Sequence, residues 1–165
     1  MRRLFLGSLF FFSMIIESTF LSYLPFPSLV PNTTMILVIC FALYYEEKNG
    51  AIIGFTAGLI KDMIVGRVVG ISALTFMLIG FLVGYYNRKV FVENATTPFV
   101  LTAASTILHE SIAFVAVFLM GYPIHVTMAL NRIYLYQTIY NALVAVPIYF
   151  IMNQILHSHF LKKSY

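Results

Sequence analysis

The sequence contains no tryptophan, only one cysteine and few charges: lysine, arginine, aspartate and glutamate together make up 10% of its 165 residues. Soluble domains carry about 25% charged residues, so the composition excludes an ordinary soluble fold. The single Cys40 cannot form an intrachain disulfide, and its apolar neighbours in the sequence suggest no redox role. Hydrophobic residues account for 61% of the chain and its mean hydropathy is +0.91, which is typical of an integral membrane protein.

Apolar runs between polar breaks predict an all-α protein with six transmembrane helices. A spanning helix needs about 20 residues, so six of them use nearly the whole chain and leave no room for a soluble domain. We therefore expect one transmembrane domain over residues 1–165. The predicted helices lie near residues 4–22, 30–45, 51–66, 69–86, 98–120 and 131–156.

The basic residues predict the orientation of these helices. If the N-terminus is cytoplasmic, seven lysines and arginines fall on the cytoplasmic side and two, Arg67 and Arg132, on the outer side. Cytoplasmic loops of membrane proteins are enriched in basic residues, so both termini are expected in the cytoplasm. The net charge of +4 is scattered over short loops and forms no basic face, which excludes nucleic acid as a partner.

Glycines recur at every fourth position, except one, in the segment GAIIGFTAGLIKDMIVGRVVG (50–70), and Asp62 fills the exception. Small residues four apart let two helix backbones approach closely in a membrane. Two further glycines in the next helix repeat the spacing. We predict that seven glycines pack helices or mediate assembly: Gly50, Gly54, Gly58, Gly66, Gly70, Gly80 and Gly84. The helix from 51 to 66 is expected to be short, about 23 Å against a hydrocarbon core of about 30 Å.

Ionisable side chains inside apolar helices cost about 2.5–3.5 kcal/mol each on insertion scales, so each is a candidate functional group. The helix rise places Glu17, Asp62 and Glu110 at one level, about 18–21 Å from the cytoplasmic ends. Arg132 could reach this level from the outer side, on the helix that also carries Asn141. We predict an intramembrane polar cluster of these five residues. A structural role is favoured, and a site for a lipid, a small ligand or a proton is the alternative.

Lys61 adjoins Asp62 in the third predicted helix. A long lysine side chain can extend towards the membrane surface and keep its charge in water. Asp62 instead lies on the row of glycines. These placements predict that Asp62→Asn perturbs the protein more than Lys61→Gln.

Enzyme motifs are incomplete. His109 and Glu110 begin an HExxH zinc motif, which needs a second histidine four residues after the first, and this position is Ala113. Ser72 ends a Gly-x-Ser triplet that begins at Gly70, but no positioned base can be identified, and Cys40 has no evident activating partner. We therefore predict a protein that is not an enzyme and that has no catalytic residue, metal ion or cofactor.

Four segments carry a family pattern: GFTAGLIKD (54–62), GRVVGISAL (66–74), YNALVAVP (140–147) and PNTTMILVICFAL (31–43). They resemble the MreD family, small membrane proteins of the bacterial rod-shape system. The family is recognised by a glycine-rich helix ending in G-L-x-x-D, then a glycine turn and a helix start G-x-x-A-L. Asn32 stands where an acidic residue is more often expected. The number and length of the predicted helices also fit the family.

The resemblance implies a multi-pass protein of the bacterial cytoplasmic (inner) membrane, surrounded by lipid, that supports lateral peptidoglycan synthesis and rod shape. It implies direct binding of MreC. It also implies association with the filament protein MreB, with RodA and with a penicillin-binding transpeptidase through the elongation complex. The family resembles in fold the substrate-binding components of energy-coupling-factor transporters, so a vitamin-like small-molecule binder is the alternative function. Bulky residues in LFLGSLFFFSMIIESTFL (4–21) argue against it, because those components usually carry small-residue repeats in this helix.

Overall fold

The computed structural model describes residues 2–20, 31–64, 68–86, 96–121 and 135–160, and every regular element in these ranges is helical. The prediction of an all-α protein is therefore confirmed for this part of the chain. The elements in chain order are α1 (Arg2–Ile15), the π-helical η1 (Ile16–Phe20), α2 (Thr33–Ala42), α3 (Glu47–Ile64), α4 (Ile71–Tyr86), α5 (Thr96–Leu119) and α7 (Thr138–Phe160). Each predicted helical range overlaps one of these α-helices.

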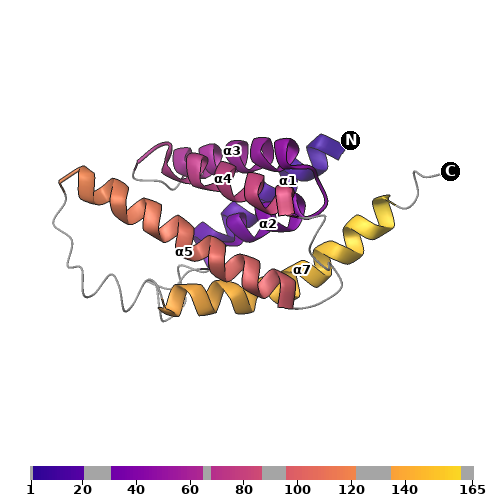
Figure 1. The fold of residues 1–165 in the computed structure, drawn as a ribbon. Coiled ribbons are helices and arrows are strands. Elements are labelled where there is room, and N and C mark those ends of the chain that lie inside the picture. The colour runs from indigo at the N-terminus through magenta and orange to yellow at the C-terminus, as the bar shows by residue number, and fades with distance from the viewer. Residues whose placement is uncertain (1, 21–30, 65–67, 87–95, 122–134, 161–165) are drawn as a thin grey trace.

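The central helix of the bundle is α2. It contacts α1, α3, α4, α5 and α7, and nine of its ten residues are buried. In Figure 1 it lies between the α3–α4 hairpin and the pair formed by α5 and α7. A helix that is hydrophobic on all sides is stable only inside a larger assembly of helices. With a length of about 15 Å, α2 is shorter than the hydrocarbon core of a bilayer, about 30 Å, and it forms the core on which the other helices pack.

The helices α3 and α4 form a tight antiparallel hairpin because glycines remove the side chains between them. A Cβ atom added at Gly50, Gly54 or Gly58 would lie closer than 3.0 Å to a backbone atom of Gly80, Phe76 or Ser72, respectively. Each step of four residues forward in α3 thus matches a step of four back in α4. The period seen in the sequence is the register of this backbone contact.

The remaining predicted glycines differ in role. Gly80 and Gly84 face the backbone of α3, at Gly50 and Glu47. Gly70 has a φ of +111° and no neighbour within 4 Å of an added Cβ, so it serves the turn before α4 and not helix packing. Gly66 lies outside the described residues.

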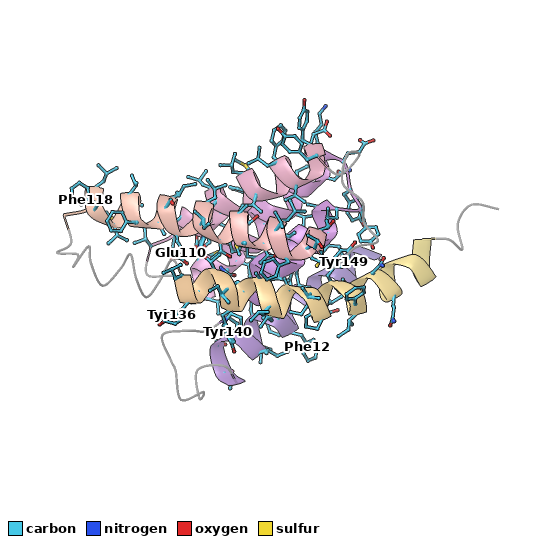
Figure 2. All side chains as sticks on the ribbon, turned by 60° about the horizontal axis from the view of Figure 1, so that its bottom comes forward. Phe12, Glu110, Phe118, Tyr136, Tyr140 and Tyr149 are labelled. Atoms are coloured by element: carbon cyan, nitrogen blue, oxygen red, sulfur yellow. The ribbon has the colours of Figure 1, made fainter. Side chains whose placement is uncertain are left out.

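Large apolar side chains cover the outside of the bundle. Phe12, Phe118 and Tyr136 are exposed, whereas Tyr149 is completely buried (Figure 2). Two segments, Thr96–Leu119 and Leu135–Gln154, are long and apolar enough to cross a membrane. Shorter apolar helices extend over Gly7–Thr19, Thr33–Ala42 and Ile71–Tyr86. An apolar surface on this scale is suited to contact with lipid.

Candidate functional site

The start of α2 lies inside the bundle and is capped by side chains. Asn32 is the N-cap residue, and its Oδ1 accepts a hydrogen bond of 3.1 Å from the backbone N–H of Met35. Asparagine is among the residues that best satisfy the free N–H groups at a helix start. The sequence PNTT (31–34) therefore begins α2 with a side-chain cap inside the bundle.

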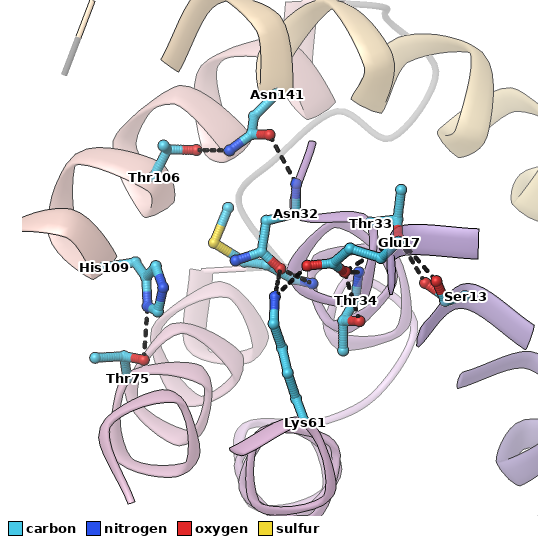
Figure 3. A network of polar contacts seen from close by, with 11 residues as sticks. Ser13, Glu17, Asn32, Thr33, Thr34, Lys61, Thr75, Thr106, His109 and Asn141 are labelled. Atoms are coloured by element: carbon cyan, nitrogen blue, oxygen red, sulfur yellow. Dashed lines mark hydrogen bonds and ion pairs between the residues drawn. The ribbon is translucent and has the colours of Figure 1, made fainter. Parts of the chain in front are cut away.

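Glu17 and Lys61 form an ion pair next to this helix start (Figure 3). The Nζ of Lys61 lies 2.5 Å from Oε1 of Glu17 and 2.7 Å from Oδ1 of Asn32. The other carboxylate oxygen of Glu17 accepts hydrogen bonds from the Thr34 hydroxyl at 3.0 Å and from the Thr34 backbone N–H at 3.4 Å. The two charged side chains are only 13% and 14% exposed. A negative carboxylate at a helix N-terminus is favoured by the helix dipole.

The position of Glu17 depends on the π-helical segment η1. A π-helix inserts one extra residue per turn and so rotates the following side chains relative to a regular α-helix. Ser13, one turn earlier in α1, donates a hydrogen bond of 2.8 Å to the Thr33 hydroxyl. Together these contacts attach the first helix to the start of α2.

Asn141 connects three helices at the same level. Its Oδ1 accepts a hydrogen bond of 2.9 Å from the backbone N–H of Asn32, and its Nδ2 donates one of 3.2 Å to the Thr106 hydroxyl. Thr106 in turn donates to the backbone carbonyl of Thr102 within α5. Asn141 is 1% exposed. One amide thus joins α7, the start of α2 and α5 (Figure 3).

Asp62 has a separate task. Its Oδ2 accepts hydrogen bonds from the backbone N–H groups of Gly70, Ser72 and Ala73, at 2.8, 3.0 and 3.2 Å. Gly70 precedes α4 and has no side chain that could cap the helix. The carboxylate of the preceding helix supplies the missing acceptor, so Asp62 closes the α3–α4 hairpin at its turn.

His109 borders the network from α5. Its Nδ1 lies 2.9 Å from the Thr75 hydroxyl, and its ring packs on that of Phe76 with centroids 5.3 Å apart. The Phe76 ring also lies 5.6 Å from Nζ of Lys61, a distance at which a cation and an aromatic face attract each other. These contacts connect α5 to the hairpin.

The predicted polar cluster is only partly assembled. Glu17 and Asn141 belong to one network through Asn32, whereas Asp62 hydrogen-bonds within the hairpin turn. Glu110 is partly buried on α5. Arg132 lies outside the described residues.

Lys61 has a partner that the sequence does not single out among the three carboxylates. It does not extend to the membrane surface but pairs with Glu17 inside the bundle. Consecutive residues on a helix point about 100° apart, so Lys61 and Asp62 serve different neighbours. Asn32 could have been found from the helix-start signal of an asparagine before an apolar run. The partners of Lys61 left no local signal.

The arrangement fixes helices to one another. The charged pair, the amides and the hydroxyls bridge α1, α2, α3, α5 and α7, and they use their hydrogen-bonding capacity on each other. No group of three histidine, cysteine, aspartate or glutamate side chains that could hold a metal ion occurs in the described part of the chain. A hollow of about 740 Å³ lies away from the network, between α1 and α3, and its lining includes Gly7, Met14, Asn49 and Ile60.

A comparison with protein-family models finds a match. The family model described as "rod shape-determining protein MreD" matches residues 1–159. No curated protein and no solved structure matches the chain. The match covers all the described helices except the last residue of α7.

Proposed function

Since the chain belongs to the MreD family and is therefore a membrane component of the system that determines rod shape, we propose that it is a non-enzymatic scaffold that binds MreC directly. The observation that carries the proposal is the use of the buried polar groups. The Glu17–Lys61 pair and the Asn141 amide hold helices together. A protein whose interior is committed to rigid packing is suited to presenting a fixed outer surface to partners.

Through MreC the protein associates with MreB, with RodA and with a penicillin-binding transpeptidase, and so supports lateral peptidoglycan synthesis. We propose a single six-helix transmembrane domain in the cytoplasmic membrane, with both termini in the cytoplasm. The segments Thr96–Leu119 and Leu135–Gln154 support membrane insertion by their length and composition. The apolar surface of the α3–α4 hairpin supports it as well.

Copurification from a mild detergent tests MreC binding. We expect wild-type protein to retain MreC, and Gly54→Leu to lose it, because a side chain at Gly54 would collide with the backbone of Phe76. Gly7→Ala is the matched control, since an added Cβ at Gly7 meets nothing within 4 Å. Absence of MreC from a well-folded wild-type preparation contradicts the proposal. Retention by Gly54→Leu shows instead that the hairpin packing does not matter for binding.

The alternative function, binding of a vitamin-like molecule, needs polar groups that are available to a ligand. Lys61 and Glu17 are paired with each other, and Asn32 and Asn141 are hydrogen-bonded. These contacts favour the scaffold over the binder. A tightly bound small molecule found by mass spectrometry of the purified protein would reverse this preference.

A further inference from the structure

The α3–α4 hairpin is short compared with a bilayer. The apolar part of α3 begins at Gly50, because the residues before it, EEKN (46–49), are polar. From Gly50 to Ile64 this part of the helix rises about 21 Å. The helix α4 rises about 23 Å along its length. The hydrocarbon core of a typical bilayer is about 30 Å thick. Any tilt of the helices shortens their projection on the membrane normal further. The hairpin therefore leaves several ångströms of a typical core unmatched.

The outer face of this hairpin is apolar at both of its ends. Ile52, near the start of α3, is 62% exposed, and Met63, near its end, is 72% exposed. Val69, before α4, and Leu74, in the first turn of α4, are exposed as well. Such side chains need lipid or protein around them over the whole height of the hairpin.

The hairpin cannot lengthen to fit a thicker bilayer. Its two helices touch backbone to backbone at Gly50, Gly54 and Gly58, and its turn is fixed by the three hydrogen bonds of Asp62. Thinning of the surrounding bilayer is one way in which a membrane accommodates a rigid protein segment that is shorter than its hydrocarbon core.

The opposite side of the molecule has ordinary height. Exposed apolar side chains of α5 extend from Phe99 to Leu119, a rise of about 30 Å. The short dimension is thus a property of the hairpin and not of the whole bundle.

We propose that the outer face of α3 and α4 is a lipid-binding surface for phospholipids with short acyl chains, and that it thins the bilayer on one side of the protein. The surface is formed by the exposed apolar residues of the hairpin, from Ile52 to Leu82. The proposal concerns the lipid around the protein and is independent of MreC binding.

The absence of tryptophan from the chain permits a direct test with single tryptophan reporters. Leu78→Trp places one on the exposed face near the middle of α4, and Ile107→Trp places a matched one near the middle of α5. Full-length protein is reconstituted in mixtures of dimyristoleoyl- and dierucoyl-phosphatidylcholine in which one of the two lipids is brominated. Quenching then gives the relative affinity of the two lipids at each reporter.

We expect the short-chain lipid to be preferred at Leu78→Trp by at least about threefold and not at Ile107→Trp. Met77→Trp, also exposed on α4, replaces Leu78→Trp if that variant does not fold. Equal relative affinities at the two reporters overturn the proposal. An α4 reporter that no brominated lipid quenches also overturns it, because protein then covers the face.

Discussion

Lys61 and Glu17 are 44 residues apart in the sequence, yet Nζ of Lys61 lies 2.5 Å from Oε1 of Glu17. The pair joins the π-helical end of the first helix to α3, beside the start of α2. Isolated charges inside a membrane are unfavourable and are found paired with one another or with backbone groups. The ion pair therefore lets two charges remain in the interior and determines which faces of the two helices meet.

Removing one partner of this pair is expected to destabilise the protein strongly. Glu17→Gln leaves the ammonium of Lys61 without a carboxylate and should cost about 3 kcal/mol, as is typical of broken buried pairs. Lys61→Met should cost a similar amount. Thermal unfolding in detergent, followed with a maleimide dye that reacts with Cys40 as it becomes exposed, measures both effects.

The double variant Glu17→Gln/Lys61→Met provides the control. Because neither charge then remains unpaired, its loss of stability should be clearly smaller than the sum of the two single losses. A double loss equal to that sum would mean that the two side chains do not interact.

Asp62→Ala is expected to destabilise the start of α4. The backbone N–H groups of Gly70, Ser72 and Ala73 lose their acceptor, and buried unsatisfied groups cost about 1–3 kcal/mol each. Asp62→Asn retains an oxygen acceptor and should cost only about 1 kcal/mol. Hydrogen exchange of the peptide covering residues 68–76 should accelerate in Asp62→Ala and change little in Asp62→Asn. Identical exchange in the two variants is incompatible with the capping role.

The structure also revises the relative importance of Lys61 and Asp62. From the sequence, Asp62→Asn is expected to be the more harmful change, because Asp62 lies on the row of glycines and the lysine side chain can extend to the membrane surface. With Lys61 paired to Glu17, Lys61→Gln breaks an ion pair, whereas Asp62→Asn preserves an acceptor. We now expect Lys61→Gln to be the more harmful change.

The difference between what the sequence predicted and what it missed is physical. A period of four is a local property of one helix, so the spacing of Gly50, Gly54 and Gly58 predicted a close backbone contact, which the structure places against α4. The Glu17–Lys61 pair depends on how separate helices rotate about their axes, and the sequence contains no local signal for that. Helix ends depend on capping contacts. The sequence predicts a helix over residues 30–45, whereas α2 extends over Thr33–Ala42. It begins after residue 30 because Asn32 caps its start.

Gly54→Ala and Gly7→Ala are predicted to change stability in opposite directions. Alanine is a better helix former than glycine by about 1 kcal/mol, and this gain is available at Gly7, where an added Cβ meets nothing within 4 Å. At Gly54 the added Cβ meets the backbone of Phe76, so the two helices must separate. Thermal unfolding should show a higher midpoint for Gly7→Ala and a lower one for Gly54→Ala. A raised midpoint in both variants would show that α3 and α4 are not in backbone contact.

Cys40 should resist thiol reagents in the folded protein. It lies in the last turn of α2 and is 1% exposed, because five helices surround α2. A maleimide should therefore leave native protein unlabelled and react only on unfolding. The variant Cys40→Ala/Asn49→Cys is the control, since Asn49 is exposed in the first turns of α3 and should be labelled at once. Rapid labelling of Cys40 under native conditions would mean that α2 is not enclosed by its neighbours. The polar network requires the start of α2 to lie at the centre of the bundle, so this result would contradict the network as well.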